Sequence, residues 1–217
     1  AGYGHVQLDH VEAALGTTAL RYGRDDHYDV VSAFIKSMRG SDPDAAVYWL
    51  ARMLEAGEDA RFIARRMVIF ASEDVGLADS GALQVAVAAA HALEHVGLPE
   101  AQLNLSQSAI YIATAPKSNR SALEIWNARS DVRNLAVGEV PAHLRDTHYQ
   151  GAEALGHGAG YDYPHDHASG TVSQQYLPDS LQHRRWYEPS VHGDEASIGK
   201  RMSQRSRDAD DRSGAPE

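Results

Sequence analysis

The sequence predicts a mainly α-helical fold, in which a multi-helix bundle is followed by an irregular extension rich in glycine, tyrosine and proline. Three observations indicate this class. Residues 28–127 are rich in alanine, and their apolar side chains recur with the 3.6-residue period of a helix. Glycine and proline interrupt that pattern at spacings that delimit separate helices. Apolar residues form 43% of the 217-residue chain, which is enough for one substantial buried core.

The first half of the bundle carries clear helix stop and start signals. A helix that begins near residue 28 is expected to end at Gly40. The next is expected to begin in Ser41-Asp42-Pro43, which supplies a capping side chain and a proline for the first turn. It should stop at Gly57, and Asp59 is the expected cap of a third helix.

The second half of the bundle is predicted to hold a strongly apolar helix. Residues 82–96 are apolar nearly all round, with Ser80 as the expected cap, so we expect this helix to be buried on most sides. A further helix should end at Pro116, and an amphipathic one should cover 118–127.

Beyond residue 129, glycine, proline, histidine and tyrosine replace the helical pattern. Large apolar residues remain frequent, so we expect this stretch to pack on the helical body as an irregular extension. Only short helical fragments are predicted within it, at 142–146 and 152–155. Strand-like pieces are expected near 171–176 and 184–188.

These patterns predict four parts along the chain. Residues 1–27 hold a short amphipathic helix (6–15) and a polar linker, which together look like the end of a preceding domain. Residues 28–130 form the helical bundle, and 131–193 form the extension packed on it. Residues 194–217 are expected to form a polar helix to about residue 204, followed by a disordered, mixed-charge tail.

Charge and composition exclude several classes of protein. Acidic residues outnumber basic ones by 30 to 20, and the formal net charge of −10 argues against a protein that covers nucleic acid with positive surface, although a local basic patch is compatible with it. The absence of cysteine removes disulfides, thiol nucleophiles, Cys-ligated zinc and iron–sulfur clusters. No apolar run reaches the roughly 18 residues that span a bilayer, so we expect no membrane partner and a cytoplasmic location.

No catalytic or nucleotide-binding motif is recognisable. A phosphate-binding loop needs G-x-x-x-x-G-K-[ST], and the one Gly-Lys pair, Gly199-Lys200, is followed by Arg201. The sequence has no G-x-G-x-x-G and no serine in G-x-S-x-G. Glu73 and Asp74 are adjacent, so a helix turns them about 100° apart, which suits pairing with nearby arginines, or capping of the following turn, better than a catalytic dyad. We therefore expect no catalytic residue, no nucleotide site and no cofactor in this chain.

Twelve histidines raise the question of a metal site. His91 and His95 share a helix face, but the glutamate between them is misplaced for the H-E-x-x-H pattern of zinc peptidases. A denser group lies in a glycine-bounded loop and comprises His157, Asp162, His165, Asp166 and His167. The alternative function is thus a small metal-dependent hydrolase built on His157, His165 and His167. The competing interpretation is a surface loop whose polar side chains satisfy its own backbone.

Basic residues near helix ends are the candidates for DNA contact. Lys36 and Arg39 lie three residues apart, just before a glycine turn. Lys117 and Arg120 flank a helix start, where free backbone N–H groups can receive a phosphate. Residues 184–187 combine two arginines with Trp and Tyr, as in sites that stack single strands. Exposure to solvent, or pairing with the acidic excess, is the competing interpretation of each.

Several ungapped blocks resemble one known family, and together they extend over about residues 6–189. The longest runs from His27 to Leu54 (HYDVVSAFIKSMRGSDPDAAVYWLARML). The others are Ala71–Asp79 (ASEDVGLAD), Ala115–Asn119 (APKSN), Pro141–Arg145 (PAHLR), Gly160–Asp166 (GYDYPHD) and Gln175–Pro178 (QYLP). They resemble the region that follows the ATPase core in the RarA/MgsA family of replication-associated recombination AAA+ proteins, which is related to the eukaryotic Werner-helicase-interacting protein. Pro164 stands where that family usually carries alanine.

The resemblance implies a C-terminal fragment, since the family's Walker A, Walker B, sensor and arginine-finger residues lie upstream of this region. Residues 6–15 would then end the helical lid of the ATPase. The bundle would be similar to the helical collar of clamp-loader subunits and would hold the full-length protein as a homotetramer. The full-length family is a DNA-dependent ATPase with ATP and Mg²⁺ as cofactors. It acts at stalled or gapped replication forks, associates with single-stranded-DNA-binding protein, and is expected at the nucleoid in the cytoplasm.

An assembly role agrees with the surplus of apolar surface predicted for 82–96, because subunit interfaces bury such a surplus. Large aromatic side chains are suitable anchors there, and the candidates are Trp49, Tyr176, Trp186 and Tyr187. Packing of these rings on their own subunit is the competing interpretation. A docking platform for replication proteins, without DNA contact, is the remaining alternative function.

Overall fold

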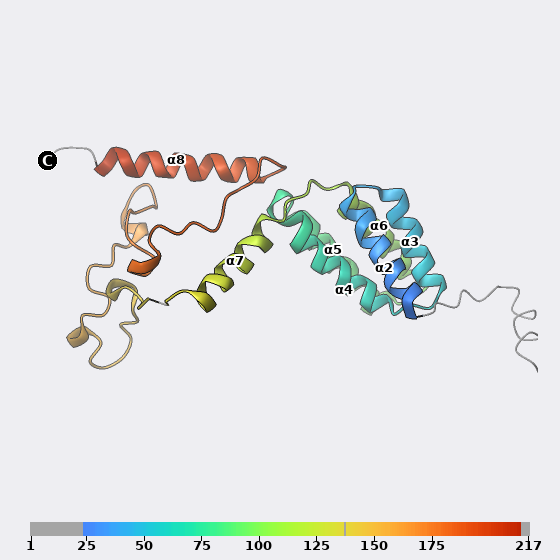
Figure 1. Cartoon of the computed structure of the whole chain (residues 1–217), viewed down its shortest axis with the longest axis horizontal. Coiled ribbons are helices and arrows are strands. Elements are labelled where there is room, and N and C mark those ends of the chain that lie inside the picture. The colour runs from blue at the N-terminus through green and yellow to red at the C-terminus, as the bar shows by residue number, and fades with distance from the viewer. Residues whose placement is uncertain (1–23, 137, 214–217) are drawn as a thin grey trace, which may run out of the picture. The chain divides into compact units, whose positions relative to one another are not determined.

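The computed structural model describes residues 24–136 and 138–213. The predicted mainly α-helical class is confirmed, because these residues form helices joined by turns and loops, without a strand (Figure 1). The strand-like pieces expected near 171–176 and 184–188 are therefore wrong: neither joins a ladder with a second segment, the condition for a strand. The helix expected at 6–15 lies outside the described residues. The chain divides after Lys117 into two compact units.

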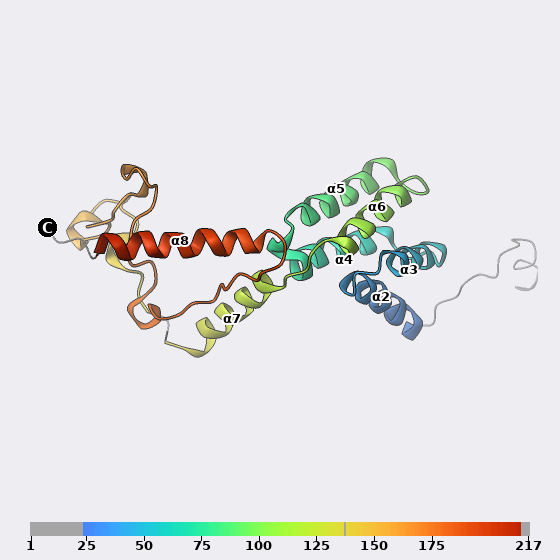
Figure 2. The ribbon, with the colours of Figure 1, turned by 90° about the horizontal axis from the view of Figure 1, so that it is seen from above.

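The described part of the first unit is a helical bundle. Its α-helices are α2 (Arg24–Arg39), α3 (Pro43–Glu55), α4 (Ala60–Phe70), α5 (Gly81–Val96) and α6 (Ala101–Thr114). Helix α3 packs on α2 and α6, and α5 packs on α4 and α6 (Figure 2). Between α4 and α5 the chain forms a π-helical turn, η1 (Ala71–Val75), and a 3₁₀ turn, η2 (Gly76–Ala78). The core between the helices includes the buried side chains of Phe34, Met38, Leu50, Met67, Leu105 and Ile112.

Local signals begin α3 and α4 as the sequence predicts. Asp42 caps α3 by accepting a hydrogen bond from the backbone N–H of Ala45 at 2.9 Å, and Pro43 takes the first helical position. Asp59 caps α4 in a similar way, through the backbone N–H of Arg61 at 2.9 Å. Each cap satisfies an N–H group that has no partner within its own helix.

The start of α5 differs from the prediction. Ser80 makes no capping hydrogen bond with its side chain. Instead, the backbone N–H of Gly81 donates to Asp79 Oδ1 at 2.9 Å, and the Tyr111 hydroxyl donates to Asp79 Oδ2 at 3.0 Å. The contact with Tyr111, which lies on α6, fixes the Asp79 carboxylate at the helix start and leaves Ser80 without that role.

The prediction that α5 is buried on most sides is also wrong within this unit. Its buried side consists of small residues and one leucine, namely Ala82, Ala86, Ala89 and Leu93. Alanine at this spacing forms one helix face and lets α5 approach its neighbours closely. The larger Leu83 and Val87 lie outside that face and are 39% and 36% exposed. The helix therefore keeps apolar surface that the described residues do not cover.

The second unit is held together differently. Its described residues form α7 (Arg120–Asn134) and α8 (Glu195–Ser213), joined by loops with the 3₁₀ turns η3 (Ala142–Leu144), η4 (Glu153–Leu155), η5 (Pro164–Asp166) and η6 (Asp179–Leu181). The helical fragments expected near 142–146 and 152–155 are thus confirmed as single turns. Within the described part of this unit, the buried residues are Ser118, Ala152 and Glu195. Polar contacts, more than an apolar core, organise this unit.

Both helices of the second unit are longer than predicted. Helix α7 continues past residue 127 to Asn134, and α8 continues past residue 204 to Ser213. The disordered tail expected from residue 205 is therefore wrong as far as Ser213. Glu195 at the start of α8 is buried and hydrogen-bonded, which fixes the first turn, and each later residue then adds one backbone bond to an existing helix.

Candidate functional site

The sequence-predicted DNA contacts fall in both units, with Arg120 in the second and the other three in the first. In the first unit, Arg39 ends α2 and forms a two-point ion pair with Asp74 of η1. Its Nε lies 2.6 Å from Asp74 Oδ1, and a terminal nitrogen lies 3.0 Å from Oδ2. The hydrogen bond to Asp74 raises the pKa of Arg39, so the guanidinium stays charged. The guanidinium also lies 5.9 Å from the ring centre of Phe70.

The π-helical turn η1 presents the carboxylate to this arginine. Such turns often occur at functional sites and shift the side chains that follow relative to a continuous α-helix. Gly76 ends the turn with a φ of 54°, a left-handed conformation that glycine adopts without steric cost. The expectation that Asp74 pairs with a nearby arginine is confirmed.

Lys117 is bound to the end of α6. Its ammonium donates to the carbonyl oxygens of Ala115 and Ala113 at 2.6 and 2.9 Å, and to Ser41 Oγ at 3.3 Å. The last turn of a helix has carbonyls without helical partners, and its dipole favours a cation there. Burial lowers the pKa of Lys117, and the nearby charge of Asp74 acts against this. Lys117 therefore has a structural role in the described bundle.

The three predicted DNA-contact residues of the first unit differ in the bonds that a ligand would have to displace. Lys36 is exposed one turn before Arg39 on α2. Arg39 is also exposed and can meet a phosphate with the part of its guanidinium that Asp74 leaves uncovered. Lys117 would have to give up bonds to helix carbonyls. The arrangement suits electrostatic contact with an anion, carried mainly by Lys36 and Arg39.

In the second unit, Arg120 lines a cavity of about 410 Å³ between α7 and residues 184–188. Asp131 holds the two sides together. Its carboxylate accepts hydrogen bonds from the Trp186 indole N–H at 2.9 Å and from the Arg184 guanidinium at 3.1 Å. The cavity is therefore fixed by a carboxylate that ties α7 to the extended segment.

The charges that line this cavity are balanced. Arg120 and Arg185 bring positive charge, whereas Glu124 and Glu188 bring negative charge. A phosphate that approaches Arg120 in this cavity is consequently repelled by carboxylates in the same lining. The surroundings of Arg120 favour DNA contact less than those of Lys36.

The carboxylate of Glu195 joins three segments of the second unit. It accepts hydrogen bonds from the Ser118 hydroxyl at 2.6 Å, the backbone N–H of Ser190 at 2.9 Å and the Tyr187 hydroxyl at 3.1 Å. Burial acts to raise the pKa of Glu195, but these hydrogen bonds outweigh it, so the pKa lies below its usual range. Burial, together with the bond to Glu195 and its charge, raises the pKa of Tyr187 to about 12.

The aromatic candidates for an oligomer interface are placed unevenly. Trp186 and Tyr187 are partly buried and use their polar atoms within the second unit. Trp49 packs against the core of the first unit, with the Arg52 guanidinium 5.4 Å from its ring centre. Tyr176 is 52% exposed. Tyr176 is therefore the candidate with the most surface to offer a partner.

The histidines of the alternative metal site are dispersed into separate contacts. His157 Nδ1 lies 2.6 Å from the Tyr149 hydroxyl, and His167 Nε2 lies 2.6 Å from Asp162 Oδ1. The ring of His165 lies 5.1 Å from a tyrosine ring. Over residues 24–136 and 138–213, no three side chains of His, Asp or Glu form a group that could hold a metal ion. The described residues thus give the hydrolase alternative no support.

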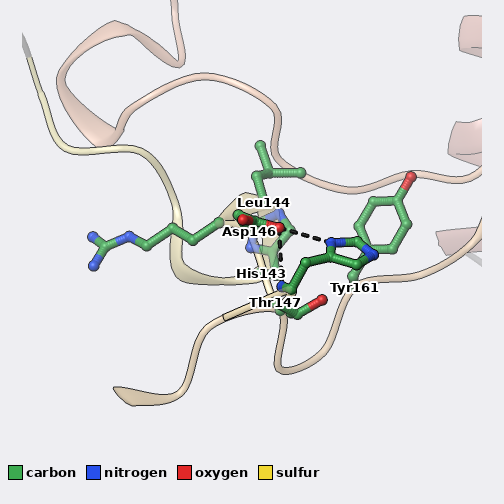
Figure 3. A pocket seen from close by; sticks show the side chains of 8 residues that line it. His143, Leu144, Asp146, Thr147 and Tyr161 are labelled. Atoms are coloured by element: carbon green, nitrogen blue, oxygen red, sulfur yellow. Dashed lines mark hydrogen bonds and ion pairs between the residues drawn. The ribbon is translucent and has the colours of Figure 1, made fainter. Parts of the chain in front are cut away.

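The second unit also contains a hollow of about 500 Å³, lined by residues 143–148, Gly158 and Tyr161 (Figure 3). Within it, Asp146 Oδ1 accepts a hydrogen bond from the backbone N–H of His148 at 3.0 Å and lies 2.8 Å from His148 Nδ1. Two hydrogen bonds lower the pKa of Asp146. The bond to the His148 side chain has the larger effect, and the bond to the His148 backbone N–H has the smaller one. The site thus keeps an ionised carboxylate on one wall and the Tyr161 ring on another.

Sequence reasoning missed the two carboxylates that organise the second unit. Asp131 meets partners 53 and 55 residues further along the chain, and Glu195 meets Ser118 across 77 residues. No local pattern contains such pairs. The one signal available for Glu195 is an acidic residue in the first turn of a helix, which indicates a helix start and not a buried junction.

The fold and these sites define a helical module whose candidate sites are basic and aromatic surfaces. A family model described as MgsA AAA+ ATPase C terminal matches residues 40–206. The chain belongs to this family, as its sequence blocks predict.

Named relatives agree with this assignment. The chain is 54% identical over 199 residues to an uncharacterised AAA domain-containing protein of Mycobacterium tuberculosis, covering 91% of this chain and 44% of that protein. It is 44% identical over 191 residues to replication-associated recombination protein A of Bacillus subtilis, with coverage of 87% and 45%. It is 42% identical over 178 residues to ATPase WRNIP1 of Dictyostelium discoideum, with coverage of 80% and 20%. The chain therefore spans less than half the length of these relatives.

The helices among the described residues differ from membrane-spanning ones. None of the helices there combines the length and the apolar character that a transmembrane helix requires.

Proposed function

We propose that this chain is the oligomerisation and DNA-proximal module of a replication-associated AAA+ ATPase, and that it is itself non-catalytic. The observation that carries the proposal is the match of residues 40–206 to the C-terminal region of an AAA+ ATPase family, with relatives named as replication-associated recombination proteins. ATP and Mg²⁺ are proposed to bind in the part of those relatives that this chain does not cover. The site of action is proposed to be the replication fork, at the nucleoid.

Exposed apolar side chains support the assembly part of the proposal. Leu83 and Val87 lie outside the buried face of α5, and Leu103 and Ile110 are exposed on α6. Surfaces of this kind are often covered by another subunit. We propose a homotetramer in which this bundle has the role of a clamp-loader collar.

Exposed basic side chains support the DNA part. Lys36 and Arg39 are proposed to contact the phosphate backbone, with Lys117 and Arg120 as further contacts, when the ATPase region is present. Single-stranded-DNA-binding protein is the proposed protein partner. Backbone contacts of this kind carry no sequence information and depend strongly on salt.

Light scattering of the chain at micromolar concentration tests the assembly part. The expected mass is four times 23.6 kDa. A mass of 23.6 kDa at every concentration contradicts it.

The ATPase activity of the full-length protein tests the DNA part. Replacement of Lys36, Arg39, Lys117 and Arg120 by alanine should weaken DNA stimulation and flatten its salt dependence. Unchanged stimulation and salt dependence contradict the proposed DNA contacts.

A further inference from the structure

Three rings form an exposed row in the second unit. Tyr161, Tyr163 and His165 alternate along the chain, and consecutive ring centroids lie 6.5 and 5.1 Å apart. Both separations fall within the range of about 4.5–7 Å in which aromatic rings interact. Tyr161 is 44% and Tyr163 50% exposed, and His165 is exposed as well. We call these three residues the ring row.

The backbone under the ring row is fixed by the residue between the two tyrosines. The N–H of Asp162 donates to Gln174 Oε1 at 3.2 Å, and its carbonyl accepts from Gln174 Nε2 at 2.7 Å. The Asp162 carboxylate lies 2.6 Å from His167 Nε2. Gln174 also donates to the Tyr176 hydroxyl at 2.9 Å. The backbone between the two tyrosines is therefore fixed before any ligand arrives, which lowers the entropy cost of binding.

The ring row continues into the hollow described above. Tyr161 lines that hollow together with Arg145, His143 and His148, and its ring is visible on one wall in Figure 3. Arg145 donates to the Val140 carbonyl and to Glu139. A ligand on the row thus has a polar cavity of about 500 Å³ beside its first ring.

We propose that the ring row binds two or three consecutive unpaired bases of a single-stranded nucleic acid, with the adjoining nucleotide in the hollow beside Tyr161. The inference rests on the proposed DNA-proximal role and deepens it by assigning contact with bases in addition to phosphates. Aromatic rings accept any base, because every base has a flat face that can stack.

Charge near the row favours bases over phosphates as the main contact. Asp162 and Asp166 belong to the same segment, and Asp146 lies in the hollow, where it is paired with His148. These carboxylates repel a phosphate backbone, and the positive charge of Arg145, which is paired with Glu139, offsets them only in part. The contribution of the row to binding should therefore depend little on salt, unlike that of Lys36 and Arg39.

Fluorescence anisotropy with a labelled oligothymidine tests the ring row on the full chain. The Tyr161→Ala/Tyr163→Ala variant should bind about 25-fold more weakly or worse, because it loses two stacks and each accounts for a factor of roughly five or more. The Tyr161→Phe/Tyr163→Phe variant keeps both rings and should bind within about twofold of the unmodified chain. Tyr48→Ala removes an exposed ring of the first unit and is the matched control, with no expected change. Circular dichroism confirms that each variant is folded.

The outcomes separate this inference from the proposed function. The proposed role of the ring row is wrong if the alanine variant binds oligothymidine as well as the unmodified chain does. It is also wrong if the phenylalanine variant loses as much affinity as the alanine variant. In both cases the DNA-proximal role stands. A preference of the unmodified chain for duplex also overturns the row. If the chain binds no DNA, the row is overturned, and the light-scattering and ATPase experiments decide the proposed function independently. If the alanine variant loses binding to single-stranded-DNA-binding protein but still binds oligothymidine as the unmodified chain does, the ring row contacts a protein partner, and the proposed contact with bases is overturned.

Discussion

Glu195 illustrates how a single buried carboxylate can hold a unit that has few buried apolar residues. A buried charge is costly unless hydrogen bonds replace the water that it loses. Here three donors, from Ser118, Tyr187 and Ser190, supply that replacement. The start of α7, the segment before α8 and the first turn of α8 are thereby joined at one group.

Glu195→Gln should therefore lower the free energy of unfolding of the second unit by about 1.5–3 kcal/mol, the range for a hydrogen bond to a charged group. The amide has a donor where the site presents donors only. Urea unfolding followed by tryptophan fluorescence measures the effect. A Trp49→Phe background leaves Trp126 and Trp186, both in the second unit, as the reporters.

The lowered pKa of Glu195 predicts that the destabilisation by Glu195→Gln depends on pH. Because the pKa of Glu195 is lowered by folding, its stabilisation is present above the unfolded carboxyl pKa of about 4.3 and is lost as the pH falls through the folded value. The difference between the unmodified chain and Glu195→Gln should therefore shrink in acid. Glu188→Gln, at an exposed position, is the control and should show no such difference. A gap that stays constant to low pH contradicts the assignment.

Two lysines that look alike in the sequence should separate by experiment. Lys117→Ala removes a donor to α6 carbonyls and should lower the stability of the first unit by about 1 kcal/mol, whereas Lys36→Ala should change it by less than about 0.5 kcal/mol.

In the full-length protein, Lys36→Ala should weaken DNA binding and reduce the salt slope by about one. Thermal unfolding and salt titration measure the two effects. Equal stability of the two variants contradicts the structural role of Lys117.

At the scale of elements, the sequence predicted the features that depend on residues close together in the chain and missed those that depend on distant residues. Asp42, Asp59 and Gly57 act on backbone groups within a few residues, and the helix boundaries that they indicate are confirmed. The π-helical turn was not predicted, and neither was Arg39 as the partner of Asp74, because the two residues lie 35 positions apart. The sequence identified the basic residues but not the partners that hold them.

The ring row shows the same limit. Of its three residues, the sequence singles out only His165, as a member of the alternative metal site. The contacts of Asp162 with Gln174 fix the backbone between Tyr161 and Tyr163, and the Asp162 carboxylate lies 2.6 Å from His167 Nε2. Such an arrangement depends on a loop whose register no helical or strand period specifies.

Two glycines in the loop beside the hollow should differ in how much stability their replacement by alanine costs. Gly156 and Gly158 both have positive φ, of 70° and 73°, but only at Gly158 would a Cβ atom collide, lying 2.2 Å from Thr147 Cγ2. Both alanine variants should lose about 1–2 kcal/mol to backbone strain. Gly158→Ala should lose roughly 1–3 kcal/mol more through overpacking. The fluorescence-detected unfolding described above measures both.

A second substitution tests the collision itself. Thr147→Ser removes the Cγ2 atom, so in the Gly158→Ala background it should recover most of the additional loss. In the Gly156→Ala background it should recover nothing, because no atom lies within 4 Å of that Cβ position. Equal behaviour in the two backgrounds contradicts the packing explanation.

At the scale of the whole molecule, apolar surface and net charge act in opposite directions. A net charge of −10 keeps chains apart, so association needs a local apolar surface strong enough to overcome that repulsion. Helix α7 contributes no buried side chain in the second unit, and α5 exposes Leu83 and Val87 in the first. Both helices therefore have apolar side chains available for contact with other subunits.

The α5 surface gives the sharpest test of assembly. Leu83→Glu/Val87→Glu places two charges on the exposed apolar side of α5, and desolvating them in an interface is costly. The mass in solution should fall from four times 23.6 kDa towards 23.6 kDa, while the helical circular dichroism persists because neither residue belongs to the buried face. Gln84→Glu adds a charge at the neighbouring exposed position and should leave the mass unchanged. If the double variant keeps the mass of the unmodified chain, subunits meet through a different surface, and the apolar side chains of α7 become the next to examine.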